Sequence, residues 1–231
     1  MAAKKSAKAK SPKAKKSKKV VKPTPEYAAE IYKRLIGHYP DAHCALDFNS
    51  PFQLIVATIL SAQCTDKRVN MVTPALFKKY KTPAAMAAAN PEELEEIIKS
   101  TGFFRNKTKS LLGMSAAVAE QHGGKVPDEM DDLVKLPGVG RKTANVVLGN
   151  AFDKNEGVVV DTHVGRVSGR LGLTKNTDPV KIEQDLMKLF PRDEWTLLSH
   201  LLIEHGRQIC DARRPKCEEC FLNDLCPSSR V

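Results

Sequence analysis

The chain has 231 residues, 37 Lys and Arg against 27 Asp and Glu, and 42% hydrophobic residues, which suffices for a large buried core and excludes a wholly disordered protein. Its longest mainly apolar run, residues 54–62, falls far short of the roughly 20 residues that span a bilayer. No apolar stretch follows the basic start, as a secretory signal would require. We therefore expect a soluble cytoplasmic protein without a membrane segment.

The positive charge is concentrated at the start of the chain. Residues 1–22 hold ten lysines and no acid, so the other 209 residues carry 27 basic and 27 acidic groups. A segment of this composition, without apolar periodicity, is typical of a solvated tail. The sequence predicts a disordered Lys-rich tail over 1–22 and a folded domain over 23–231.

Helical patterns recur through the folded part. Apolar residues spaced by three and four lie around positions 31–35, 69–76, 111–118 and 182–189. A capping residue followed by proline marks helix starts at 82–83, 90–91 and 178–179. Only the three valines at 158–160 have an extended pattern, and one such run cannot form a sheet. The sequence predicts an all-α fold.

A glycine-containing turn lies at residues 136–144, with the sequence LPGVGRKTA, between helical patterns at 130–135 and 141–150. Gly138 and Gly140 allow positive φ and let a phosphate approach the amides that a new helix leaves unpaired. Such a hairpin would bind a phosphodiester without reading base sequence. An ordinary helix–helix turn, in which the glycines only relieve steric contacts, is the alternative.

Lys142 falls in the first turn of the second helix of this hairpin. The partial positive charge of a helix N-terminus disfavours an ammonium there, and a capping argument would favour an acid. A lysine with the reference pKa near 10.4 is almost fully protonated at pH 7, so a nucleophilic lysine needs a destabilised charge or a nearby base. Lys142 is thus a candidate nucleophile, or a simple phosphate contact.

Asp161 follows the valine run and precedes a helical pattern through Leu171, which makes it a candidate N-cap. A helix over 141–150 rises roughly 15 Å, and residues 151–160 can span up to about 33 Å. The chain can therefore return to the level of Lys142 and set two helix N-termini side by side. Capping alone is the alternative role for Asp161, and it is compatible with catalysis.

Four of the six cysteines are crowded near the end of the chain, with gaps of six, two and five residues: Cys210, Cys217, Cys220 and Cys226. In a cytosolic protein this clustering indicates metal rather than disulfides. Zinc sites usually use two close pairs, whereas an iron–sulfur cluster tolerates wider gaps, so the spacing favours iron–sulfur over zinc. Cys44 and Cys64 have no matching partner and are expected to be inert thiols.

The loop between the first two of these cysteines is basic. If the loop closes on a metal, it presents three cations together that could grip a phosphate backbone: Arg213, Arg214 and Lys216. The alternative is that these charges only keep the loop soluble.

Three motifs together, residues 136–144, residues 160–163 and the 6-2-5 cysteine spacing, resemble endonuclease III, the iron–sulfur helix-hairpin-helix family of DNA glycosylases. Residues 60–66 and 102–107 are similar to two further family segments, so the resemblance covers about residues 25–228 and excludes the tail. It implies two helical lobes with a cleft between them: a six-helix barrel-like lobe over about 43–155, and an iron–sulfur lobe formed by about 23–42 and 156–231.

The resemblance also implies an activity and a partner. The family's bifunctional enzymes excise oxidised pyrimidines from double-stranded DNA and nick the backbone by β-elimination. Lys142 matches the lysine that forms a Schiff base with the sugar, and Asp161 matches the assisting carboxylate. The four clustered cysteines match the ligands of a [4Fe-4S] cluster. A monomer acting on damaged duplex DNA at the bacterial nucleoid is expected.

Gln63 and Phe103 match the two positions that fill the space left by a flipped base. Many relatives have an aliphatic residue at the second position. Alternatively, Gln63 only ends a buried helix, and Phe103 or Phe104 is a core aromatic. Further DNA contacts are expected from the hairpin and from the helix after Asp161, at Gly138, Val139, Gly140, Arg141, Thr143 and His163.

Two other functions are compatible with parts of the sequence. A monofunctional relative such as the adenine mispair glycosylase shares the fold, but Lys142 and the absence of a carboxylate in 52–63 argue against it. Only five residues follow Cys226, so we do not expect the extra C-terminal recognition domain of that relative. A non-catalytic DNA-binding protein with a structural metal explains the glycines, tail and cysteines, but leaves the Lys142 and Asp161 arrangement unexplained.

Overall fold

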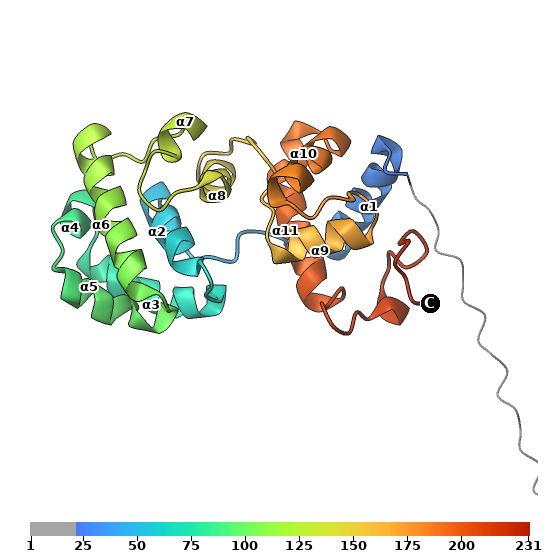
Figure 1. Ribbon diagram of the computed structural model, residues 1–231, viewed down its shortest axis with the longest axis horizontal. Coiled ribbons are helices and arrows are strands. Elements are labelled where there is room, and N and C mark those ends of the chain that lie inside the picture. Colours follow the sequence, from blue (N-terminus) through green and yellow to red (C-terminus); the bar gives the residue numbers. More distant parts are fainter. Residues whose placement is uncertain (1–21) are drawn as a thin grey trace, which may run out of the picture.

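The computed structural model describes residues 22–231, and within them all regular structure is helical (Figure 1). The predicted all-α fold is confirmed. The three valines at 158–160 lie outside any helix and form no strand. The helices, including three short 3-10 helices marked η, are α1 (Pro25–His38), α2 (Pro51–Ser61), α3 (Asp66–Lys79), α4 (Pro83–Ala87), α5 (Pro91–Ile98), η1 (Lys99–Thr101), α6 (Phe104–Gln121), α7 (Met130–Leu133), α8 (Arg141–Ala151), α9 (Thr162–Arg170), α10 (Pro179–Leu189), η2 (Arg192–Glu194), α11 (Trp195–Gln208) and η3 (Cys217–Glu219).

Local capping explains where most of the longer helices begin. A Ser, Thr, Asn or Asp side chain accepts a backbone N–H of the first turn in seven helices, and proline follows the cap in five of them. The predicted helix starts at 82–83, 90–91 and 178–179 are confirmed. The seven capping residues are Thr24, Ser50, Thr65, Thr82, Asn90, Asp161 and Asp178.

The buried apolar side chains form two separate clusters, which define two lobes (Figure 1). The first lobe contains α2 to α8, and its cluster draws on residues 46–148. The second lobe contains α1 with α9 to α11, and its cluster draws on residues 28–39 and 158–222. Because α1 packs against α10 and α11, the first helix of the described chain belongs to the same lobe as its last helices.

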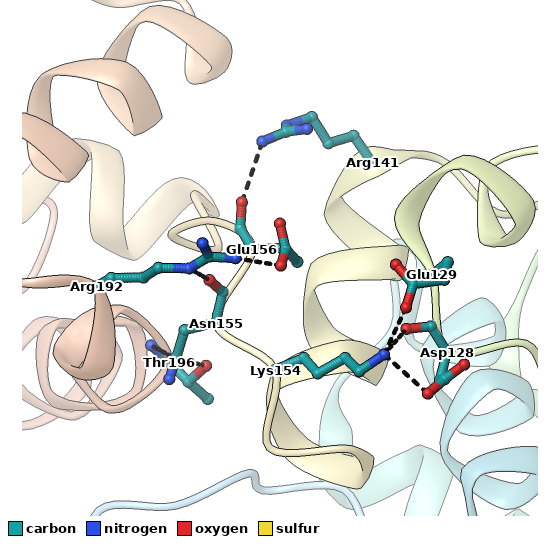
Figure 2. A network of polar contacts seen from close by, with 8 residues as sticks. All are labelled: Asp128, Glu129, Arg141, Lys154, Asn155, Glu156, Arg192 and Thr196. Carbon is teal, nitrogen blue, oxygen red and sulfur yellow. Dashed lines mark hydrogen bonds and ion pairs between the residues drawn. The ribbon is translucent and has the colours of Figure 1, made fainter.

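The segment between α8 and α9 crosses from the first lobe to the second, and polar contacts attach it to the first lobe (Figure 2). The ammonium of Lys154 lies 2.8 Å from a carboxylate oxygen of Asp128 and 2.7 Å from one of Glu129. Arg141 donates to the backbone carbonyl of Glu156 at 3.4 Å.

The same segment is attached to the second lobe through its next residues (Figure 2). The side-chain oxygen of Asn155 accepts the backbone N–H of Thr196 at 3.0 Å, and the guanidinium of Arg192 donates to the carbonyl of Asn155 at 2.7 Å. Arg192 also forms an ion pair with Glu156. The crossing segment is thus fixed on both sides.

Of the helices in residues 22–231, none is both long and apolar enough to cross a membrane. The predicted tail over 1–22 lies outside the described residues except for Lys22.

Candidate active site

A groove of about 700 Å³ lies between the two lobes and is lined by residues of both. The first lobe contributes Lys142 from α8 and the turn around Gln63, and the second contributes Asp161, His163 and part of α11. The structure therefore brings Lys142 and Asp161, 19 residues apart in sequence, to one groove.

Asp161 is the N-cap of α9, as predicted. One oxygen of its carboxylate accepts the backbone N–H groups of His163 and Val164, each at 2.8 Å. The partial positive charge of a helix N-terminus favours an anion at this position. Asp161 is only half-buried, so capping leaves the carboxylate in contact with the groove.

The predicted hairpin is present, and Gly138 has the expected positive φ, whereas Gly140 does not. Gly138 has φ +78°, and a Cβ there would lie 2.6 Å from the Cβ of Ser110, so this position requires glycine for conformation and for space. Gly140 has φ −94° and is the N-cap of α8. The helix before the turn, α7, ends at Leu133 rather than near residue 135. The exposed Lys142 lies in the first turn of α8.

Val139, between the two glycines, anchors the turn from within. Its side chain is 5% exposed and belongs to the core cluster of the first lobe, and its N–H donates to the carbonyl of Leu136 at 3.0 Å. Thr143 lines a smaller cavity beside Gly138. The DNA contacts expected of Gly138, Val139, Gly140 and Thr143 stay predictions.

Arg141 is held by a partner that the sequence did not reveal. Its guanidinium lies 3.0–3.2 Å from the carboxylate of Glu183 on α10, which also accepts from the side-chain amide of Asn145 at 2.9 Å. The side chain of Glu183 is 8% exposed and that of Arg141 46%. Hydrogen bonding to Glu183 raises the pKa of Arg141. Arg141 thus joins the start of α8 to the second lobe, and its expected DNA contact stays a prediction.

Gln63 and Phe103 lie on neighbouring exposed turns of the first lobe. Both line a cavity of about 260 Å³ that also touches Gly138 and Thr143. Phe103 is 62% exposed, so it is not a core aromatic, whereas Phe104 packs against the core. The structure thus brings the two predicted inserting residues to one edge of the hairpin.

His200 is a groove residue that sequence reasoning missed. Burial, with a smaller contribution from His43, lowers the pKa of His200 to about 4, so its imidazole is neutral at pH 7. Its Nε2 lies 2.8 Å from the side-chain oxygen of Asn150 and therefore carries the proton. In the sequence His200 is one more residue of an amphipathic helix, with no signal that it faces a groove.

His163 lines the same groove, but its ring is also engaged within the second lobe. Its Nδ1 lies 3.0 Å from the guanidinium of Arg166, which in turn donates to the carbonyls of Gly206 and Cys210. His163 is thus part of the packing between α9 and α11, and its DNA contact stays a prediction.

The four clustered cysteines all line one cavity of about 170 Å³ at the end of the second lobe. Within residues 22–231, no three Cys, His, Asp or Glu side chains are grouped closely enough to share a single metal ion. A single zinc would need thiolates about 2.3 Å from one centre, whereas an iron–sulfur cluster takes each thiolate on a different iron. Four cysteines around a common space therefore fit a cluster better than one ion.

The surroundings of these cysteines support the same fit. Burial, with smaller contributions from the neighbouring cysteines, raises the pKa of the Cys226 thiol to about 11. A thiolate is disfavoured there unless a metal neutralises it. Arg170 donates to the carbonyls of Asp211 and Ala212 at 2.6 and 2.7 Å and to the sulfur of Cys210 at 3.3 Å.

The basic loop between Cys210 and Cys217 has a fixed backbone and exposed side chains. One oxygen of Asp211 accepts the backbone N–H groups of Arg213 and Arg214 at 2.8 and 2.9 Å, and these bonds lower the pKa of Asp211. Arg213, Arg214 and Lys216 are all exposed. Their contact with a DNA backbone stays a prediction, with loop solubility as the alternative. Cys44 and Cys64 form no disulfide, and their expected inertness stays a prediction.

Comparison with known proteins gives consistent matches. Residues 56–192 match the family model of the HhH-GPD superfamily of base excision DNA repair proteins, and residues 210–226 match the iron–sulfur binding domain of endonuclease III. The endonuclease III of Synechocystis sp. is 56% identical over 204 residues, which cover 88% of this chain and 93% of that protein.

Two solved structures are similar over most of their length. A non-covalent endonuclease III–DNA complex and a trapped endonuclease III–DNA covalent intermediate each match with a TM-score of 0.85 and 43% identity. The alignments cover 89% of this chain and 96% and 97% of those chains.

Proposed function

Because this chain belongs to the endonuclease III family of base excision DNA repair proteins, we propose that it excises oxidised pyrimidines from duplex DNA and then nicks the backbone. The observation that carries this proposal is the interlobe groove. It holds an amine from the start of one helix and a carboxylate from the start of another, each helix in a different lobe.

The chemistry assigns separate roles to these two groups. The nitrogen of Lys142 attacks C1′ of the damaged nucleotide, the C1′–N bond to the base breaks, and the base leaves with a proton. The sugar ring opens to a Schiff base between C1′ and the lysine nitrogen. Loss of a proton from C2′ then expels the 3′ phosphate, and water releases the enzyme from the sugar.

Asp161 assists because positive charge develops on the sugar as the base departs. An ionised carboxylate beside C1′ stabilises that charge and can take a proton from the Lys142 ammonium, so that the neutral amine attacks. The two backbone N–H groups at the start of α9 hold the Asp161 carboxylate in place in the groove. The covalent enzyme–DNA intermediate named for the similar solved structure supports the same chemistry.

The iron–sulfur segment would serve binding rather than the reacting atoms. Cys210, Cys217, Cys220 and Cys226 would hold a [4Fe-4S] cluster, which, when bound, supplies iron–thiolate bonds that tie the basic loop to the end of α11. The loop would then present three cations to the phosphates of a bound duplex. We expect a monomer acting in the cytoplasm, where the nucleoid DNA lies.

Borohydride trapping tests the proposal. The protein is mixed with a duplex that contains one abasic site and is reduced, so that a Schiff base becomes a stable amine. We expect a covalent adduct with the wild type and none with Lys142→Gln, which should still bind the duplex. Lys135→Gln is the matched control, because Lys135 is an exposed lysine of the same hairpin and is paired with Asp132.

The alternatives predict different outcomes of this experiment. A non-catalytic DNA-binding protein would bind the duplex without any adduct. A monofunctional glycosylase would release a base from damaged DNA without trapping at Lys142. An adduct that persists in Lys142→Gln would overturn the assignment of the nucleophile.

A further inference from the structure

Lys107 on α6 is a lysine with a buried ammonium. The residue is 5% exposed, and its Nζ donates to two backbone carbonyls, those of Leu60 and Thr101, each at 2.8 Å. Desolvation by burial lowers the pKa of Lys107. A lysine is almost never fully buried unless its charge is paired, so two neutral carbonyls are an unusual set of partners.

Both carbonyls lie at the ends of helices. Leu60 is in the last turn of α2, and Thr101 is the last residue of η1. The last carbonyls of a helix have no partner within it and carry partial negative charge, which attracts a cation. The single ammonium of Lys107 therefore joins two helix ends that are 41 residues apart in sequence.

Each of these helix ends leads into a residue with a left-handed backbone. Gln63 follows α2 with φ +54°, and Phe103 follows η1 with φ +48°. Neither residue is glycine, and side chains disfavour this conformation, so the surrounding contacts must hold it in place. The backbone N–H of Lys107 donates to the carbonyl of Phe103 at 3.1 Å, the first intrahelical bond of α6, so the turn at Phe103 leads directly into the helix that carries Lys107.

The two turns present their side chains together. Gln63 and Phe103 are both exposed, and they line one cavity with Lys107 beneath them. The chemistry assigned to Lys142 and Asp161 does not use the buried cation of Lys107 or the two strained, exposed residues above it. The contacts of Lys107 instead fix the distance between the side chains of Gln63 and Phe103.

We propose that Lys107 is a positioning residue, which sets Gln63 and Phe103 at a fixed separation so that both enter the duplex together when a base is flipped. This inference rests on the proposed function, and in particular on the insertion of these two side chains. Insertion offsets part of the unstacking free energy of the flipped base only if both side chains reach the vacated space. Holding them in place beforehand removes the need to order two separate loops on binding.

The test replaces the ammonium and keeps the bulk of the side chain. Lys107→Met retains an unbranched side chain of similar size but leaves the carbonyls of Leu60 and Thr101 without a donor. Lys109→Met is the matched control, because Lys109 is an exposed lysine of the same helix. Both variants are prepared as the full chain with the cluster bound.

Insertion is read by fluorescence, without any chemical step. The probe is a duplex that carries 2-aminopurine beside a tetrahydrofuran abasic analogue, and 2-aminopurine brightens when a neighbouring side chain unstacks it. We expect Lys107→Met to lose most of this signal while its affinity for undamaged duplex stays within about threefold of wild type, because the buried Lys107 side chain does not itself reach a phosphate. Its single-turnover excision of thymine glycol should fall about tenfold to a hundredfold.

A second comparison separates positioning from a general loss of stability. In the Gln63→Ala, Phe103→Ala background, the residues on which Lys107 acts are already removed, so Lys107→Met should produce no further loss of excision. Equal losses in both backgrounds would overturn the proposal, because Lys107 would then act through other residues. A wild-type fluorescence signal in Lys107→Met would overturn it as well.

Two other outcomes are a Lys107→Met variant that does not fold and a wild type without activity. If Lys107→Met does not fold, Lys107→Gln is measured in its place, since an amide can still donate to one carbonyl, and it should lose part of the signal; full signal in Lys107→Gln overturns the proposal. If the wild type neither excises nor traps, the proposed function fails. The fluorescence assay needs no reaction and still decides whether Lys107 positions the two side chains.

Discussion

Glu183→Gln removes the charge that joins the start of α8 to the second lobe. In the wild type, Glu183 accepts three contacts from Arg141 and one from Asn145. The backbone approaches so closely that a Cβ on Gly157 would lie 2.0 Å from a carboxylate oxygen of Glu183. A glutamine fits the space, but its NH2 group would face donors of Arg141 or Asn145. The substitution therefore replaces an attraction by an unsatisfied contact.

The burial of Arg141 and Glu183 determines how much free energy of unfolding the substitution removes. Removing one member of a fully buried ion pair costs about 3–5 kcal/mol, whereas an exposed pair is worth about 0–1 kcal/mol. The carboxylate here is 8% exposed but the guanidinium is 46% exposed, so Arg141 regains water when its partner is lost. We therefore expect a loss of about 2 kcal/mol in the free energy of unfolding, or roughly 4–8 °C in Tm for a domain of this size.

Thermal unfolding of the cluster-bound protein measures this loss. Glu93→Gln is the matched control, because it breaks the pair of Glu93 with Lys79, in which both side chains are about half exposed. The control should lower Tm by less than about 4 °C. If Glu183→Gln lowers Tm no more than Glu93→Gln does, the bridge between the lobes contributes nothing, and the reasoning is refuted.

Three other substitutions and one truncation give further predictions. Asp161→Asn keeps a good N-cap but should lower single-turnover excision by about 10²–10⁴-fold, with Asp178→Asn, another helix cap, as the unaffected control; near wild-type excision would exclude the assisting role. Cys220→Ser should lose the visible iron–sulfur absorbance, whereas Cys64→Ser should keep it, and full absorbance in Cys220→Ser would contradict the ligand assignment. The pKa of His200 is about 4 in the folded state against 6.5 in the unfolded state, so on acidification the unfolded state takes up the proton first. The contribution of His200 to the free energy of unfolding is therefore complete above pH 6.5 and falls by up to about 3 kcal/mol as the pH drops to 4. His200→Gln should flatten this part of the pH profile of urea unfolding, and an unchanged profile would argue against a neutral buried imidazole. Deleting residues 1–22 should weaken affinity for undamaged duplex and flatten its salt dependence without abolishing excision, and identical salt slopes would show that the tail does not contact DNA.

Local signals in the sequence predicted the helices and several residues of the candidate site. Capping acts between residues two or three apart, so Asn90, Asp161 and Asp178 could be assigned as helix starts without any knowledge of the fold. The spacing of the four cysteines and the glycines of the hairpin are likewise local patterns. They were sufficient for an all-α protein with a hairpin and a metal segment.

Which of Phe103 and Phe104 is exposed to solvent was decided by the tertiary structure. Phe103 and Phe104 are adjacent, and the sequence could not decide which of them faces solvent. Phe103 has a left-handed backbone after Gly102, whereas Phe104 begins α6 and packs against the core. One residue of difference in backbone conformation thus sends one ring outward and the other inward.

The contacts that join the two lobes were also decided only by the fold. Sequence reasoning placed Lys142 and Asp161 at two helix starts, and distance arithmetic allowed them to meet, but the groove that they share needs both lobes. The partner of Arg141 is Glu183, 42 residues away, and the partners of Lys107 are carbonyls 47 and 6 residues away. Helix propensity and capping act within one turn of the chain, whereas a buried charge takes whichever partner the packing of distant helices brings to it. Such pairings leave no periodic or local trace in the sequence.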